Sequence, residues 1–178
     1  MVDPVNNSID MKLSFIGSSH IAYWILDRYF ADHEYTNYGL PGAGISYIER
    51  FRLDVSDSIA IIMIGTNDLY EINGTNMEEY ATRYVKAIAS IKTQATYLIS
   101  ILPRNDYQDS ASLNKFIAKL NSCIRPKAES AGIHYIDMFP LLIKDGRMDD
   151  SITFDELHLN AKGYALLSET IRQSIGLK

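Results

Sequence analysis

Residues 58–64 read SIAIIMI, and GTND (residues 65–68) follows at once. The run is apolar on both alternations and rich in β-branched side chains, which is typical of a parallel strand buried on both faces. A glycine and three polar residues then stand where that strand should end. Ligands of open parallel sheets bind beyond the carboxyl ends of the strands. The stretch therefore predicts both a fold class and the place of a functional site.

Segments of similar character occur on both sides of this run, at 13–16, 35–38, 96–102 and 133–136. Helical periodicity separates them, with apolar stripes over 77–91 and 113–124 and a last helix that begins after Asn160. Pro126 is expected to kink or restart the second of these helices. Alternating strands and helices predict an α/β protein, a three-layer α/β/α sandwich around a five-stranded parallel sheet. Right-handed crossovers favour the strand order 2-1-3-4-5.

Length and charge exclude several classes of protein. The 178 residues suit one domain, which we place at 11–178, after a polar segment 1–10 interpreted as a flexible tail. A formal net charge of −5 argues against nucleic acid or an anionic membrane as partner. Cys123 stands alone, so no disulfide can form within the chain. No apolar run approaches the roughly 18 residues of a membrane span, and we expect a cytoplasmic protein.

The residues that follow the predicted strands fit acyl transfer to water. Ser19 lies at a strand-to-helix turn, where the field of a helix N-terminus favours negative charge. Asp155 precedes His158 by three residues, so its carboxylate can fold back onto Nδ1–H and leave Nε2 to accept the serine proton. Candidate donors to an oxyanion are the backbone N–H groups of Ser19 and Gly42 and the side-chain amide of Asn67. Each residue alone has an ordinary interpretation, a helix cap for Ser19 and a turn for Asn67.

Other polar and aromatic residues are weaker candidates. His20 is expected to form a pocket wall or to support the site, and Arg104 and Tyr107, after the fourth strand, could line its mouth. Arg104 would then hold an anionic group of the substrate, although a solvated loop explains it equally well. Tyr23 and Trp24 are interpreted as packing residues. The four histidines show no metal-ligand spacing, so no metal site is expected.

Four blocks together resemble the SGNH hydrolases, also called GDSL-type esterases and lipases. FIGSS (15–19) is similar to their GDS block, NYGLPG (37–42) to the second block, GTND to the GxND block and DELHLNAKGY (155–164) to the DxxHxN ending. The resemblance implies a flavodoxin-like fold, hydrolysis of a small-molecule ester or thioester, and no cofactor. It assigns Ser19 as nucleophile, rather than the neighbouring Ser18, with Asp155 and His158 completing the triad and Gly42 and Asn67 as oxyanion donors.

Two positions depart from the family pattern. Ser18 replaces the usual aspartate, which changes the support of the neighbouring loop, and Leu159 replaces the common proline after the histidine. Asp68, the last residue of GTND, is expected to bond neighbouring backbone.

The functional expectation is a serine esterase for a compact acyl group, an acetyl ester of a carbohydrate or a similar substrate. No long apolar insertion offers a lid or an acyl-chain tunnel. Alternatives within the family are a lysophospholipase and an acyl-thioesterase, and acyl transfer to another alcohol would use the same acyl-enzyme. An alternative of another class is a weakly active or non-catalytic binding module. Nucleotide binding is disfavoured because neither GxxxxGK[ST] nor GxGxxG follows the first strand.

Overall fold

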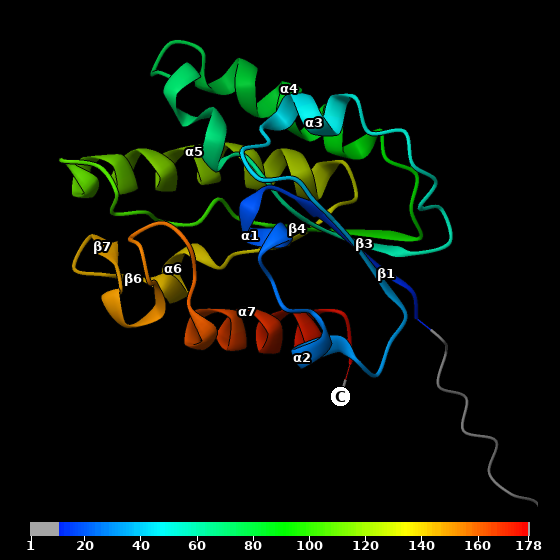
Figure 1. Ribbon diagram of the computed structural model, residues 1–178. Helices are drawn as coiled ribbons and strands as arrows, with labels where there is room; N and C mark the ends of the chain where they lie inside the picture. The colour runs from blue at the N-terminus through cyan, green and yellow to red at the C-terminus, as the bar shows by residue number, and fades with distance from the viewer. Residues whose placement is uncertain (1–10, 178) are drawn as a thin grey trace, which may run out of the picture.

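The computed structural model describes residues 11–177 and is built on one five-stranded parallel sheet in the order β2-β1-β3-β4-β5 (Figure 1). Every pair of neighbouring strands is parallel, as the apolar runs predicted. The predicted tail, residues 1–10, lies outside the described residues. The strands are β1 Leu13–Gly17, β2 Tyr35–Gly39, β3 Ile59–Met63, β4 Ala95–Ile99 and β5 His134–Ile136.

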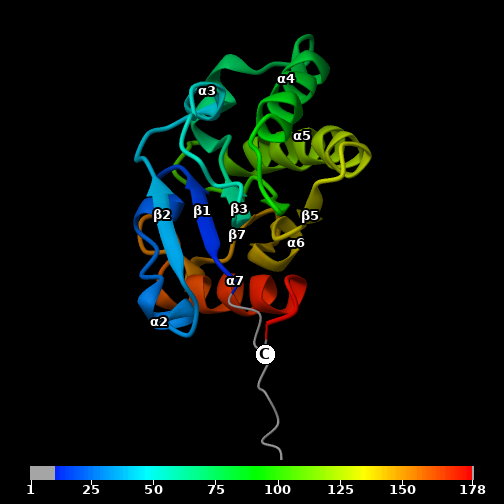
Figure 2. The ribbon, with the colours of Figure 1, turned by 90° about the vertical axis from the view of Figure 1, so that its right-hand side faces the viewer.

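Helices cover both faces of the sheet and confirm the three-layer sandwich (Figures 1 and 2). One layer consists of α3 Ile45–Glu49, α4 Met77–Ala89 and α5 Ser110–Ser130. The opposite layer consists of α1 Ser19–Ala22, α2 Asp27–Phe30, α6 Phe139–Leu142 and α7 Ala161–Ser174. Along β3 the side chains alternate between two separate cores, with Ile62 packed under the first layer and Ile61 under the second.

Two element boundaries differ from those predicted. The fourth strand ends at Ile99 instead of Leu102, because Asn121 on α5 takes over the backbone of Ile101: its Oδ1 accepts the N–H at 3.0 Å and its Nδ2 donates to the carbonyl at 2.8 Å. Pro126 does not restart the helix as expected, since α5 continues through it to Ser130. The proline lies near the end of this helix, where it removes one hydrogen bond while Ile124 and Ala128 stay anchored in the core.

A short hairpin after α6 was not predicted. It pairs β6 Ile143–Lys144 with β7 Arg147–Met148 through a turn at Asp145 and Gly146, both of which have positive φ. The Asp-Gly pair is the sequence signal for such a turn. A 3₁₀ helix, η2 Asp150–Ile152, then leads toward α7.

The register of the sheet gathers three loops at one edge. Gly17, the last residue of β1, pairs with Gly39 in β2 and with Met63 in β3. The three strands therefore end at the same level of the sheet. The segments that follow them, GSSH (17–20), GLPG (39–42) and GTND (65–68), start side by side. The last of them continues as the 3₁₀ helix η1 Thr66–Glu71. Among residues 11–177, no helix is both long and apolar enough to cross a bilayer.

Candidate active site

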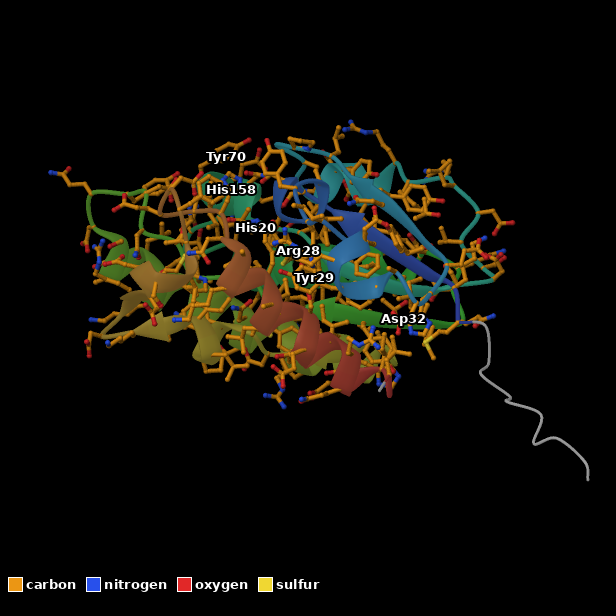
Figure 3. All side chains as sticks on the ribbon, turned by 60° about the horizontal axis from the view of Figure 1, so that its bottom comes forward. His20, Arg28, Tyr29, Asp32, Tyr70 and His158 are labelled. Atoms are coloured by element: carbon orange, nitrogen blue, oxygen red, sulfur yellow. The ribbon has the colours of Figure 1, made fainter. Side chains whose placement is uncertain are left out.

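A chain of hydrogen bonds joins the three residues predicted to form a triad. Ser19 begins α1, and its Oγ lies 2.9 Å from Nε2 of His158, a residue 139 positions further along the chain. On the other side of the imidazole, Nδ1 lies 2.7 Å from Oδ2 of Asp155. A serine hydroxyl, an imidazole and a carboxylate at these distances have the geometry of a nucleophile, its general base and the group that orients the base. Figure 3 labels His158 among the surrounding side chains.

The loop that carries His158 is held by its own aspartate. The other carboxylate oxygen of Asp155 accepts the backbone N–H of His158 at 2.6 Å and that of Leu157 at 3.1 Å. Glu156, between Asp155 and Leu157, has a φ of +68°, a left-handed conformation that residues other than glycine seldom adopt. Its carbonyl accepts the N–H of Asn105 at 2.6 Å, which fixes this turn against the chain after β4. The imidazole is thus oriented by the backbone as well as by the carboxylate.

Asp155 is suited to remain ionised. Its partial burial acts to raise the pKa of the carboxyl group, but the hydrogen bonds from the His158 ring and from the backbone N–H groups of His158 and Leu157 outweigh burial and hold the pKa below its usual value. A carboxylate beside Nδ1–H fixes the tautomer in which Nε2 accepts a proton. It also stabilises the imidazolium that would form.

His20 lies beneath the site and not at its surface. The side chain is 2% exposed, and Nε2–H donates to the Leu157 carbonyl at 3.1 Å. Burial and the neighbouring His158 lower the pKa of His20 to about 4. The imidazole rings of His20 and His158 are 5.3 Å apart, centroid to centroid. The burial leaves little of His20 open to a substrate, and its bond to Leu157 agrees with the second role expected for it, support of the loop that carries His158.

The buried His20 predicts a loss of stability in acid. The unfolded chain takes up this proton near pH 6.5 and the folded chain only near pH 4, so stability falls as the pH drops through that window, by about 3 kcal/mol in all. In urea unfolding at pH 7, 5.5 and 4.5, we expect His20→Gln, which keeps a donor for Leu157, to flatten the dependence on pH. His134→Gln, at an exposed position on β5, serves as control. Equal slopes for the His20 variant and the wild type would contradict the assignment.

The candidate oxyanion donors lie on the loops after β1, β2 and β3. The backbone N–H groups of Ser19 and Gly42 have no acceptor within residues 11–177. Gly42 has a φ of +77°, and no atom lies within 4 Å of where a side chain would project. Asn67 donates through Nδ2 to the carbonyl of Ala43 at 2.9 Å, which orients its amide and engages one of its two N–H groups. The second N–H stays available to a ligand.

Asp68 joins two of these loops. Its Oδ2 accepts the N–H of Ile45 at 2.9 Å, just beyond the GLPG loop, and the Tyr80 hydroxyl at 2.8 Å. Gly44 makes the approach possible, because a Cβ at that position would lie 2.0 Å from Oδ1 of Asp68. Burial raises the pKa of the Asp68 carboxyl group. Asp68 has the structural role expected of it, but the backbone N–H that it accepts belongs to Ile45, 23 residues away, and not to a neighbour in sequence.

Ser18 is placed differently from Ser19. Its Oγ is buried and has no hydrogen-bond partner among the described residues. It borders a cavity of about 10 Å³, which His20 and Ile101 also line. That volume is roughly one probe sphere of water size. Ser18, which replaces the usual aspartate, therefore borders a small void behind the turn that carries Ser19, and its hydroxyl is not hydrogen-bonded to His158.

Arg104 and Tyr107 do not form the anion site suggested by the sequence. Arg104 is 8% exposed. Its guanidinium donates to Asp106 from Nε at 2.6 Å and also from Nη2, and to the Thr66 carbonyl from Nη1 at 3.1 Å. Tyr107 covers it, with its ring 4.9 Å from the guanidinium carbon. Because Asp106 already neutralises this arginine, a substrate anion would have to displace an internal carboxylate. Arg104 instead stabilises the GTND turn through its hydrogen bond to the Thr66 carbonyl.

Two aromatic rings beside His158 were missed as site residues. Tyr23, 52% exposed, meets the imidazole edge-on with 5.3 Å between centroids, and Phe154, 67% exposed, stacks on it at 6.0 Å. The packing role predicted for Trp24 is confirmed by its burial, but Tyr23 does not share it. Phe154 directly precedes Asp155, so its place next to the DELH segment was the available signal. Among the described residues, no group of three or more His, Cys, Asp or Glu side chains could hold a metal ion.

A model of the GDSL-like lipase/acylhydrolase family matches residues 17–166. The chain belongs to this family. Membership places it among the enzymes that hydrolyse carboxylic esters, and the matched region contains Ser19, Gly42, Asn67, Asp155 and His158. The departures at Ser18 and Leu159 lie inside the same region and do not prevent the match.

Solved structures of similar proteins have the same fold. A GDSL-like lipase from Bacteroides thetaiotaomicron superposes with a TM-score of 0.76 at 24% identity, over 99% of this chain and 92% of the other. An acetylxylan esterase from Geobacillus stearothermophilus gives a TM-score of 0.67 at 18% identity, over 94% and 95% of the two chains. At these identities the likeness shows the fold alone.

One curated relative is named for an activity other than ester hydrolysis. It is an N-acylneuraminate cytidylyltransferase from Escherichia coli, 27% identical over 176 residues. The match includes 92% of this chain but only 40% of the relative. Because the chain spans well under half of that protein, the activity in its name is not carried over to this acylhydrolase-family chain.

Proposed function

We propose that the chain is a serine esterase that removes a small acyl group, an acetyl group foremost, from a hydroxylated substrate such as a sugar. The observation that carries this proposal is the hydrogen-bonded series Ser19–His158–Asp155 at the carboxyl edge of the sheet. Family membership supports ester hydrolysis as the reaction class.

The geometry supports a two-step mechanism through an acyl-enzyme. Ser19 Oγ attacks the ester carbonyl carbon while His158 Nε2 takes the hydroxyl proton, and Asp155 stabilises the resulting imidazolium. The oxyanion accepts hydrogen bonds from the N–H groups of Ser19 and Gly42 and from the Asn67 amide. Collapse of this intermediate breaks the ester bond, and the leaving alcohol receives the proton from Nε2. Water then attacks the acylated Ser19 with His158 again as base, which releases the acid and restores the hydroxyl.

The space beneath the Ser19 turn gives a long acyl chain no path into the core. The cavity bordered by Ser18 and His20 has a volume of about 10 Å³, and its far wall consists of core residues such as Ile101 and Leu102. An acyl chain of several methylene groups has no tunnel there into the core. This favours an acetyl ester over the longer chains of a lysophospholipase or an acyl-thioesterase substrate.

Two of the similar proteins carry names that contain a sugar. One is an acetylxylan esterase and the other an N-acylneuraminate cytidylyltransferase, so the first names an acetylated sugar polymer and the second an acidic sugar. Both motivate sugar acetates as the natural test substrates. Neither name selects one sugar over the other.

The test is hydrolysis of p-nitrophenyl esters from acetyl to decanoyl, followed by release of acetate from acetylated xylose and acetylated neuraminate. We expect kcat/KM to be highest for the acetyl ester and to decline with chain length. A preference for acyl chains beyond about eight carbons would contradict the compact site. If no ester is cleaved and a fluorophosphonate does not label the protein, the binding-module alternative replaces the esterase.

A further inference from the structure

A groove of about 310 Å³ lies next to the triad, between the start of α7 and the chain that runs from α1 into α2. Tyr23, Tyr29, Phe154 and Tyr164 form its aromatic walls, and Arg28 lies among them. In Figure 3, which looks onto the α2 and α7 side of the molecule, Arg28 and Tyr29 are labelled between His20 and Asp32. The volume is at the lower end for small-molecule sites and suits a single sugar.

The groove adjoins the half of the active site that handles the leaving group. Tyr23 and Phe154 line it, and the same two rings contact the imidazole of His158. In the proposed mechanism His158 Nε2 returns its proton to the leaving oxygen, so the alcohol half of the ester must lie at His158. Two of the proposed oxyanion donors, Gly42 and Asn67, lie on the loops after β2 and β3, which do not line the groove. An alcohol bound at His158 can extend between Tyr23 and Phe154 into the groove.

Arg28 gives the groove a specific chemistry. Its side chain is exposed, and its guanidinium has no ion pair or hydrogen bond within residues 11–177. The adjacent Asp27 is engaged by the Tyr35 hydroxyl. Arg104 and Arg83, in contrast, are each paired with a carboxylate. A planar guanidinium with open donors matches a carboxylate in two parallel hydrogen bonds.

The aromatic walls complement this charge. More than half of Tyr23 and Phe154 is exposed next to the imidazole, and rigid rings provide contact area at low cost in conformational entropy. The C–H faces of a sugar ring pack well on such surfaces, while its hydroxyl groups face solvent. We propose that the groove binds the alcohol half of the ester and that this alcohol is a carboxylate-bearing sugar, held by Arg28 and packed on Tyr23 and Phe154. This inference rests on the proposed esterase function.

The experiment compares two matched substrates, an O-acetylated sugar acid and the carboxamide of the same acetylated sugar. We expect the wild type to prefer the acid in kcat/KM by about 10- to 100-fold, chiefly through KM, as one charge-assisted pair provides. Arg28→Gln should abolish the preference and Arg28→Lys should keep part of it. Arg52→Gln, an exposed arginine beyond α3 in the opposite layer, is the matched control and should behave as the wild type.

Three outcomes would overturn the inference: equal rates on acid and carboxamide, a preference that survives in Arg28→Gln, or a stronger preference for an acetylated sugar phosphate. Thermal unfolding of each variant shows whether it is folded. Hydrolysis of p-nitrophenyl acetate by the wild type separates the two proposals. If it occurs while acid and carboxamide are cleaved alike, the esterase stands and the carboxylate site fails; if it does not occur, the esterase itself fails.

Discussion

Ser19→Ala is expected to lower kcat for p-nitrophenyl acetate by about 10⁴- to 10⁶-fold, the scale on which a serine hydrolase loses activity with its nucleophile. The reason is geometric: the Ser19 hydroxyl lies 2.9 Å from His158 Nε2 and has a base to activate it. The residual rate would come from the oxyanion donors and from binding. Steady-state kinetics, with thermal unfolding to confirm the fold, measures the effect.

Ser18→Ala is the matched control one residue away. Its hydroxyl is buried without a partner among the described residues, so removal of an unsatisfied polar group should leave activity intact and keep or slightly raise the melting temperature. A fluorophosphonate should label Ser18→Ala as it labels the wild type and should not label Ser19→Ala. The reverse pattern, an active Ser19→Ala beside an inactive Ser18→Ala, would show that the nucleophile is misassigned.

Asp155→Asn is expected to reduce kcat by about 10⁴-fold with little change in stability. The amide oxygen can still accept the N–H groups of Leu157 and His158, which keeps the loop in place. The amide nitrogen then faces Nδ1, and two donors cannot share one hydrogen bond, so the imidazole adopts the tautomer with Nε2 protonated. In that state His158 cannot take the proton from Ser19.

Asp149→Asn is the control for this substitution. Asp149 also accepts a backbone N–H two residues on, that of Ser151 at 2.8 Å, but it has no contact with His158. Its variant should keep wild-type kcat. A loss below about tenfold in Asp155→Asn, measured on the same substrate series, would contradict the orienting role of Asp155 and leave His158 acting without it.

The parts of the protein that were predictable are those that local sequence determines. A buried strand that ends in a glycine marks its own carboxyl end, so three such strands predicted where GSSH, GLPG and GTND would meet. The contact between Asp155 and His158 was predictable as well, because three residues of separation let one turn close it. The meeting of Ser19 with His158 depended on the order of the whole sheet and on the position of α7.

The parts that were not predictable depend on distant partners. The early end of β4 follows from Asn121, 20 residues beyond Ile101 on another element. The exposure of Tyr23 follows from the end of α1 at Ala22, which turns the next residue toward His158 while Trp24 enters the core. For Arg104 the sequence did contain a signal, since Asp106 stands two residues away and neutralises it.

The bridge made by Asp68 has a consequence for the timing of catalysis. One carboxylate fastens the segment after Gly42 to the turn that holds Asn67, and Tyr80 ties both to α4. The proposed donors are therefore in position before any ester arrives, and their arrangement is part of folding and not of each turnover. Such a pocket stabilises charge without reorganising. The donors are thus preorganised for the transition state. Selection of the substrate is left to the groove lined by Tyr23 and Phe154.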